Sequence, residues 1–428
     1  MSRFLQTIAC LFLCVFVSSG YANSVLIKNA RLYTLTDKGT IEQGYILIKD
    51  GLIERVGENL DFEFDGKIID ANGFSVTPGL VNSYTHLGLT EIDAVSASLD
   101  ISTEDELFGA SFKIAPAINP TSTVLPHNRL NGLTHAIVAP SPGHQLFAGI
   151  GAVIRLSDSE TLMINENAGL FADFSALGSE LSGGSRASAY AKIRQSFLDA
   201  KDFAKHQNKI ESGNWREYFL PLHDLEALVP IIDGDLPFIV TAHRVSDIRL
   251  LLKLKKEFNL SLIIAGASEG WIIADELAQA KVPVIIDPMA NLPLDFDQLA
   301  ARLDAATRMH SAGVSLLFTG VSWRNTHSAY LVRQAAGSAA RYGLPVTEAI
   351  KAMTLNPALA FGFADRFGSI EKGKEADLVI WDGHPLELLT RASRVFIAGE
   401  ETPMTTRSTR LRDRYRDLSG PYPPAYTK

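Results

Sequence analysis

The sequence predicts an α/β protein built from a TIM-like (β/α)8 barrel and a small β-sandwich formed from both chain ends. In the middle of the chain, continuous apolar runs alternate with helical patterns, as expected for parallel strands buried on both faces. Short segments near both ends alternate apolar and polar residues instead. The length of 428 residues, 46% of them hydrophobic and 21% charged, suits one barrel with a satellite domain.

The first 22 residues are expected to be a cleaved secretory signal. Arg3 precedes an apolar run from Leu5 to Val17, and small residues lead to a cleavage site near Ala22. The apolar run is shorter than the ~20 residues of a spanning helix, so no stable membrane anchor is expected. The chain's two cysteines, Cys10 and Cys14, lie inside this segment, which leaves no thiol for disulfides, catalysis or zinc in a secreted or periplasmic mature chain.

Residues 23–77 and 364–402 are expected to form the composite β-sandwich. The segments VLIKNARLYTL and GYILIKDGLIERVG are separated by turn residues, and GSIEKGKEADLVIWDG with SRVFIAGEE repeats this pattern near the other end. Neither segment is large enough for a comfortable core of its own. We therefore expect them to meet, because the two ends of a barrel lie close together.

Residues 78–363 are expected to form the barrel. Apolar strand candidates such as PFIVTAH, VPVIIDP and VSLLFTG alternate with helical patterns such as VSDIRLLLKLKKEF, giving close to eight strand–helix units. The alternative is a doubly wound open sheet, but no Gly-rich dinucleotide turn follows the early strands.

Residues 403–428 are expected to be a solvated tail. Its arginines are diluted by Asp413 and Asp417, and the whole chain carries a formal net charge of −8 at pH 7. No nucleic-acid partner is expected at that balance.

The ends of the predicted strands hold the candidate chemistry, because barrel active sites form at the carboxyl ends of their strands. His86 follows the first strand, two residues after Tyr84, and His243 follows PFIVTA. Two other strands end in Gly266 and Gly320, which offer no ligand. A catalytic zinc needs about three protein ligands, so these strand ends provide an incomplete set.

The chain resembles the amidohydrolase superfamily, in its secreted imidazolonepropionase-like branch. The resemblance rests on VTPGLVNSYTHLGL, LPFIVTAHRVSDI and ASEGWIIADELAQAKVPVII, and on a long stretch that begins LPVTEAIKAMTLNPALAFGFADRFGSIEKGKEADLVIWDG. It implies a barrel with one or two divalent metals that hydrolyses amide or other C–N bonds, including those of small peptides and cyclic amides.

Carried onto this chain, the family's ligand pattern is retained at His86 and His243 only. The other ligand or base positions of the family fall on residues that do not suit a metal: Tyr84, Ala176, Gly266 and Gly320. The resemblance therefore implies a zinc or similar ion that is bound weakly or not at all.

Two functional hypotheses follow. The first is a pseudoenzyme that binds a small molecule or peptide, or an active paralogue. The second is an active hydrolase with a rearranged single-metal site, which uses His86 and His243 and recruits His144, Asp173 or Glu180. His86 and His243 also have a plainer interpretation, as residues that hydrogen-bond to the barrel wall.

Overall fold

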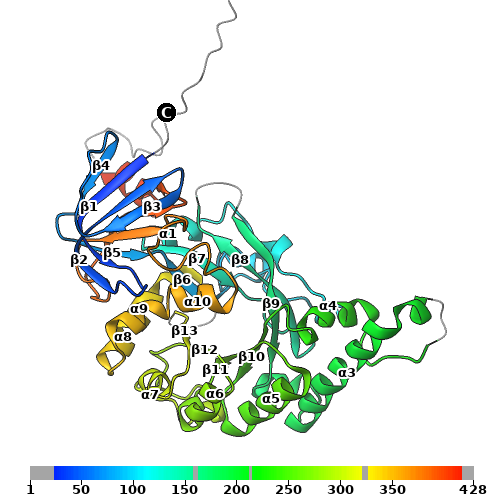
Figure 1. Cartoon of the computed structure of the whole chain (residues 1–428). Coiled ribbons are helices and arrows are strands. Elements are labelled where there is room, and N and C mark those ends of the chain that lie inside the picture. Colours follow the sequence, from blue (N-terminus) through cyan, green and yellow to red (C-terminus); the bar gives the residue numbers. More distant parts are fainter. Residues whose placement is uncertain (1–23, 158–161, 212–214, 321–325, 417–428) are drawn as a thin grey trace, which may run out of the picture.

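The computed structural model describes residues 24–157, 162–211, 215–320 and 326–416, arranged as two eight-stranded sheets with surrounding helices (Figure 1). The predicted signal segment and the end of the predicted tail lie outside these residues. Among the residues described, no helix is both long enough and apolar enough to cross a bilayer.

The first sheet joins the two ends of the chain. Its hydrogen-bonded order is β16-β15-β14-β5-β1-β2-β3, with β4 paired to β1. The N-terminal and C-terminal segments meet where β5 runs antiparallel to β14, with Pro78 opposite Leu378. Its strands are β1 (Ser24–Tyr33), β2 (Thr40–Lys49), β3 (Leu52–Gly57), β4 (Lys67–Asp70), β5 (Ser75–Pro78), β14 (Leu378–Trp381), β15 (Ala392–Ile397) and β16 (Glu400–Glu401).

The second sheet is the barrel, with the strand order β6 to β13. Its end strands β6 and β13 lie side by side, and the Thr319 hydroxyl just after β13 donates to the Tyr84 carbonyl oxygen at 2.9 Å. The sheet is therefore nearly closed, as the sequence predicted. Its strands are β6 (Leu80–Thr85), β7 (Leu133–Val138), β8 (Phe147–Arg155), β9 (Met163–Asp173), β10 (Phe238–Ala242), β11 (Leu262–Gly266), β12 (Val284–Ile286) and β13 (Leu316–Phe318).

Strand β8 breaks the strict alternation of strands and helices that the sequence pattern suggests. It runs antiparallel to both β7 and β9, whereas the other neighbouring pairs of the barrel are parallel. Its segment FAGIGAVIR contains Gly149 and Gly151, which weaken the strand pattern. At Gly149, φ is +115°, and an added Cβ would lie 2.4 Å from the Phe112 carbonyl oxygen, so only glycine fits.

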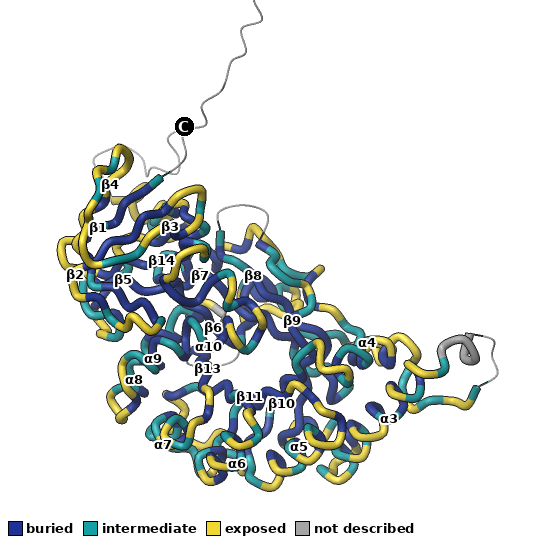
Figure 2. Tube along the Cα trace, viewed as in Figure 1, coloured by how far each residue is buried: buried dark blue, intermediate teal, exposed yellow. Residues whose placement is uncertain are grey.

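Helices cover the outside of the barrel (Figure 2). The predicted helix VSDIRLLLKLKKEF is α5, which buries Ile248, Leu251 and Leu254 on one face and ends at Asn259 in the left-handed conformation. The helices are α1 (Val124–Arg129), α2 (Ala176–Glu180), α3 (Arg186–Glu211), α4 (Leu222–Ile232), α5 (Val245–Phe258), α6 (Ala274–Gln279), α7 (Ala305–Ser311), α8 (Val332–Arg341), α9 (Val346–Lys351), α10 (Leu355–Ala360) and α11 (Arg407–Arg416). Short 3-10 turns cover Ser96–Ser98, Ala115–Ala117, Gly270–Ile273, Phe296–Gln298 and Thr326–Leu331.

The barrel interior is a packed apolar core rather than a channel. Val81, Ile239, Ile263 and Leu317 belong to one buried cluster inside it. A second cluster fills the layer between the strands and the outer helices. Any site must therefore lie beyond the strand ends.

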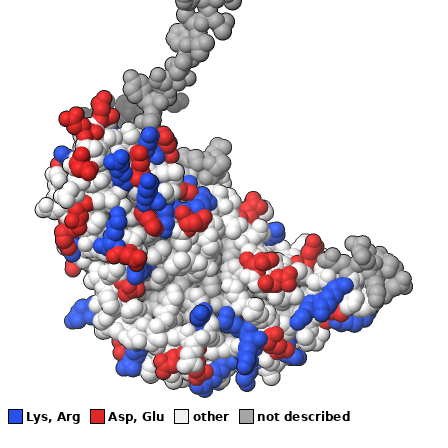
Figure 3. Space-filling view, in the orientation of Figure 1, with Lys and Arg blue, Asp and Glu red and all other residues white. Residues whose placement is uncertain are grey.

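Acidic and basic side chains are interspersed over the chain-end sheet, while the middle of the barrel face is largely uncharged (Figure 3). The C-terminal helix α11 buries none of its residues. The face in this view thus offers a mixed surface rather than a basic stripe.

Candidate functional site

The structure places both sequence-predicted histidines beyond strand ends. His86 directly follows β6 and His243 directly follows β10, and their residues are only 2% and 7% exposed. Both strands are largely buried, so their packing fixes where the following imidazole stands.

Each imidazole hydrogen-bonds to a serine from the loop after the next strand along the chain. His86 Nε2 lies 3.2 Å from the Ser141 hydroxyl, and His243 Nδ1 lies 2.9 Å from the Ser268 hydroxyl. Because both rings contact a serine, each is held by a loop at the barrel mouth.

Burial lowers the pKa of His243 below its ordinary value, although Asp295, Asp173, Asp297 and Asp247 act in the opposite direction. The imidazole is therefore neutral at pH 7. A neutral imidazole suits metal ligation, but it suits a serine hydrogen bond equally well.

The acids near His243 have partners of their own. Arg186 at the start of α3 hydrogen-bonds to Asp247 at 2.9 Å and to Asp297 at 2.6 Å. These acids raise the pKa of the arginine, while burial lowers it. Two of the four nearby carboxylates are thus held by one guanidinium.

Gly266, at the end of β11, lies directly beneath the His243 ring. An added Cβ there would stand 2.5 Å from His243 Cε1, and the glycine has φ of +92°. The imidazole thus fills the space that a side chain at position 266 would need, and the backbone conformation itself favours glycine.

Gly320, after β13, is different. An added Cβ would lie 3.4 Å from Asn82 Nδ2, which is ordinary contact, so a small side chain would fit there. Among the described residues, none therefore requires glycine at this position.

Tyr84 is a packing residue of the barrel interior. Its ring meets Phe171 edge-on with centroids 5.3 Å apart, and it packs against the apolar interior cluster. Ala176 begins α2, and its backbone N–H donates to Asp297 Oδ2 at 2.8 Å. These two family ligand positions thus hold side chains without a donor suited to zinc at neutral pH.

The residues that a rearranged site would recruit are engaged elsewhere or exposed. Asp173 Oδ1 accepts from the backbone N–H groups of Ser175 at 2.8 Å and Gly178 at 3.0 Å, and from the Ser175 hydroxyl at 2.6 Å. His144 pairs with Glu104 at 2.9 Å on the surface, and Glu180 is exposed at the end of α2.

Within the described parts of the chain, no three His, Cys, Asp or Glu side chains come together to hold a metal ion. Residues 321–325 after β13 are outside the described ranges and read VSWRN, with none of these residue types. A zinc site requires about three protein ligands, and the described donors do not form such a group.

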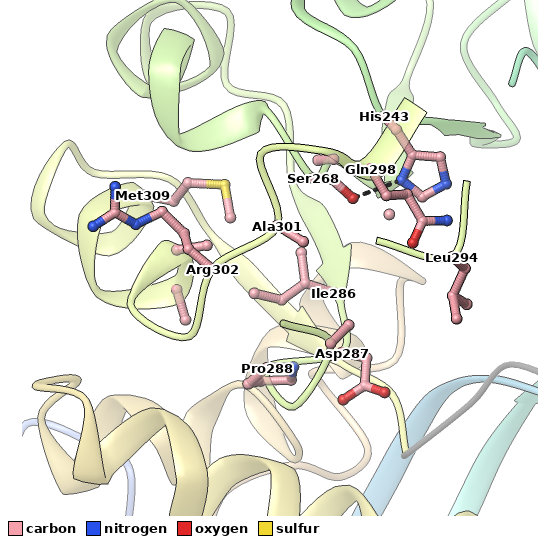
Figure 4. Close-up of a pocket in the computed structure, with 15 residues that line it drawn as sticks. His243, Ser268, Ile286, Asp287, Pro288, Leu294, Gln298, Ala301, Arg302 and Met309 are labelled. Atoms are coloured by element: carbon pink, nitrogen blue, oxygen red, sulfur yellow. Dashed lines mark hydrogen bonds between the residues drawn. The ribbon is translucent and has the colours of Figure 1, made fainter. Parts of the chain in front are cut away.

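A cavity of about 90 Å³ opens beside His243, and sequence reasoning missed it (Figure 4). It extends from the ends of β10, β11 and β12 to the loop before α7 and into that helix. Its lining residues are His243, Gly266, Ala267, Ser268, Ile286, Asp287, Pro288, Ala290, Leu294, Gln298, Ala301, Arg302, Ala305, Ala306 and Met309.

Asp287 is the acid of this cavity and directly follows β12, well apart from His243 in the close-up (Figure 4). Burial raises the pKa of Asp287 to about 7, against a smaller opposing effect from the Met289 backbone N–H. One carboxylate oxygen accepts from that N–H at 2.9 Å. The signal was present in the strand candidate VPVIIDP, whose final acid was not included among the strand-end groups.

Asp287→Asn is expected to raise the free energy of unfolding near pH 8 by about 1–2 kcal/mol, because partial exposure to solvent screens the charge that the substitution removes. The folded pKa lies above the ordinary value, so ionisation above about pH 7 destabilises the fold. The gain should shrink toward zero as the pH falls from about 7 to about 4, because the carboxyl becomes neutral first in the folded state and then in the unfolded state as well. Denaturant unfolding across this range measures the effect. Asp275→Asn, on the exposed side of α6, is the matched control, and an equal gain in both variants would contradict the assignment.

Comparisons with known proteins give a consistent family assignment. The Amidohydrolase family model matches residues 271–406. An imidazolonepropionase from Brucella anthropi is 28% identical, covering 86% of this chain and 95% of the relative. Amidohydrolase tasK from Hapsidospora irregularis is 21% identical over 89% of this chain. This chain spans only 43% of the length of that protein.

A solved structure shows the same architecture. The crystal structure of an amidohydrolase from Thermotoga maritima matches with a TM-score of 0.78 and 26% identity, covering 88% of this chain and 99% of that one. The likeness thus includes both the barrel and the sheet made from the chain ends.

Proposed function

This chain belongs to the amidohydrolase superfamily, and from that premise we propose that it is a non-catalytic member of this family of hydrolases. In this proposal it binds a small molecule or peptide at the barrel mouth, or pairs with an active relative. Metal-dependent hydrolysis of C–N bonds, to which the family resemblance points, is absent.

The donor set carries this proposal. Hydrolysis of this kind needs a metal ion and a base for the attacking water. The described residues offer no group of three ligands, and the family's base position is Gly320. Glycine can neither ligate a metal nor accept a proton through a side chain.

The contact between His243 and Gly266 supports the same conclusion. The ring lies where a second ligand at position 266 would stand, and it hydrogen-bonds to Ser268. His86 is likewise bound to Ser141. The two imidazoles thus have structural partners that account for their burial.

Metal content and hydrolysis, measured on the same preparation, test the proposal. The full chain is expressed with its leader and recovered from the secreted or periplasmic fraction, where N-terminal sequencing checks the proposed cut after Ala22. It is then incubated with zinc, desalted, and assayed by elemental analysis and with dipeptides and cyclic amides. We expect clearly substoichiometric zinc, no difference between the wild type and His243→Ala, and no chelator-sensitive hydrolysis.

The opposite result would establish the rearranged-site hydrolase instead. That result is about one zinc per chain, its loss in His243→Ala, and hydrolysis that a chelator abolishes. Asp275→Asn, remote from both histidines, serves as the control for nonspecific effects of substitution on metal uptake.

A further inference from the structure

The cavity beside His243 has a mainly apolar wall. Ala267, Ile286, Ala301 and Met309 contribute to it, and the first three lie on different segments of the barrel mouth. Such a wall can bury the hydrocarbon part of a ligand, at roughly 25 cal/mol for each Å² of apolar surface removed from water.

The loop after β12 extends the apolar surface outward. Met289, Leu292, Leu294, Phe296 and Leu299 are between 37% and 88% exposed, in a stretch of the chain that borders the cavity at Leu294. Leu294 is 87% exposed and also lines the cavity, so the rim and the wall are continuous. Apolar residues gathered in this way on an exposed segment typically mark a site that binds an apolar partner.

The basic side chain of the cavity is already paired. Arg302 donates to both carboxylate oxygens of Asp304, which Arg308 also contacts, and the Arg302 guanidinium lies 4.5 Å from the centre of the Trp271 ring. His243 is held by Ser268. Both groups are thus engaged by neighbouring side chains.

Asp287 is the opposite case. It accepts a hydrogen bond from the Met289 backbone N–H, and no cation within the described ranges forms an ion pair with its carboxylate. It lines the cavity from the end of β12, next to the apolar Ile286. A carboxylate that lies against an apolar wall, with no countercharge among the described residues, favours a ligand that brings a positive charge.

We propose that this cavity binds a hydrophobic amine, with the ammonium group against the Asp287 carboxylate and the hydrocarbon part between Ile286, Met309 and Leu294. This inference deepens the proposed ligand-binding role and rests on it. It does not depend on whether the chain hydrolyses anything.

A matched set of probes tests the charge preference. Hexylamine, hexanol and hexanoate share one hydrocarbon chain and differ in charge, and their binding to the full chain is measured by calorimetry near pH 8, where most Asp287 is ionised. We expect hexylamine to bind at least about tenfold more tightly than hexanol, and hexanoate to bind more weakly than either.

Three variants locate the effect. Asp287→Asn should bring hexylamine and hexanol to within about twofold of each other, since the amide keeps the shape but not the charge. Leu294→Ser should weaken both probes together, and Asp275→Asn should change neither. Near-ultraviolet circular dichroism confirms that each variant is folded.

The proposal is overturned if hexylamine does not bind, if hexanol binds equally well, or if the amine preference survives in Asp287→Asn. Failure of the proposed function is a separate result. Zinc-dependent hydrolysis in the metal experiment would remove the non-catalytic assignment and leave the amine preference to be judged by these titrations.

Discussion

Gly266→Ala is expected to lower the free energy of unfolding by about 2–4 kcal/mol, the sum of backbone strain and overpacking. The alanine would keep φ of +92°, and its methyl group would stand 2.5 Å from His243 Cε1. Chemical denaturation near neutral pH measures the loss. This is a large effect for one methyl group, because the neighbouring ring is buried and hydrogen-bonded.

Gly313→Ala separates the two contributions. Gly313 has the same φ of +92°, but its added Cβ would meet nothing closer than 3.9 Å. It should cost only the strain of the left-handed backbone, about 1–2 kcal/mol. In the double variant Gly266→Ala, His243→Ala, the loss should be about 1–3 kcal/mol smaller than the sum of the two single losses, because the added methyl group no longer meets the imidazole ring. Equal losses at Gly266 and Gly313, without coupling to His243, would mean that the ring does not occupy this space.

The result matters for function because it measures whether side chains at positions 243 and 266 can be present at the same time. If the coupling is present, a histidine at position 266 cannot be restored while His243 keeps its bond to Ser268. The packing around His243 would then exclude a side chain at position 266, in addition to the sequence lacking one.

Arg155→Met is expected to lower the free energy of unfolding by about 3 kcal/mol, because it removes the buried charge beside Asp377 and one of the two arginines that pair with Glu375. Arg155, at the end of β8, forms an ion pair with Glu375, and the two side chains are each 16% exposed. Its charge also lowers the pKa of Asp377, which burial raises. Urea denaturation near pH 8 gives the loss.

The surroundings replace Arg155 only in part. His135 Nε2 lies 3.5 Å from Asp377 Oδ2, but burial keeps the pKa of His135 well below its ordinary value, so the ring is neutral. That ring also stacks on Phe367 with centroids 4.0 Å apart. Arg366 contacts Glu375 from the solvent side and remains partly exposed.

Acid should reduce the penalty of Arg155→Met. Without Arg155 the folded pKa of Asp377 rises further above its unfolded value, so protonation relieves the buried charge as the pH falls toward about 5. Arg394→Met, which breaks the exposed pair with Glu401, should cost less than about 1 kcal/mol and is the control. A comparable loss in both variants would show that the Arg155 pair contributes no more than a surface pair.

These side chains join the two sheets. His135 and Arg155 belong to the barrel strands β7 and β8, whereas Glu375 and Asp377 directly precede β14 of the chain-end sheet. Gly79 continues the main chain from β5 to β6, and its N–H donates to the Asp377 carbonyl oxygen at 2.8 Å. The buried charges therefore stabilise the interface on which the relative position of the two sheets depends.

The barrel was predictable from local patterns. Continuous apolar runs became buried strands, and the amphipathic segment at residues 245–258 became α5 with the expected bounds. Strand β8 was not predicted, because two glycines weaken its pattern and its partners are set by pairing with β7 and β9. Strand pairing is a nonlocal choice that a single segment does not encode.

The candidate site was only partly predictable for the same reason. Residue types alone placed His86 and His243 at strand ends and left glycine at two others. The serine partners of both rings lie 55 and 25 residues away in sequence, so no spacing rule reveals them. Asp287 was visible as a strand-end acid, but its raised pKa depends on burial that only the packed barrel provides.

By itself the sequence determined the fold class, the superfamily resemblance and which side chains are available as ligands or bases, because these depend on residue type and local periodicity. Only the tertiary structure decided that the His243 ring fills the space over Gly266. It also decided that Arg302 is paired with Asp304 while Asp287 lines an apolar cavity. Both are properties of groups brought together from distant segments, where contact and desolvation rather than composition determine the chemistry.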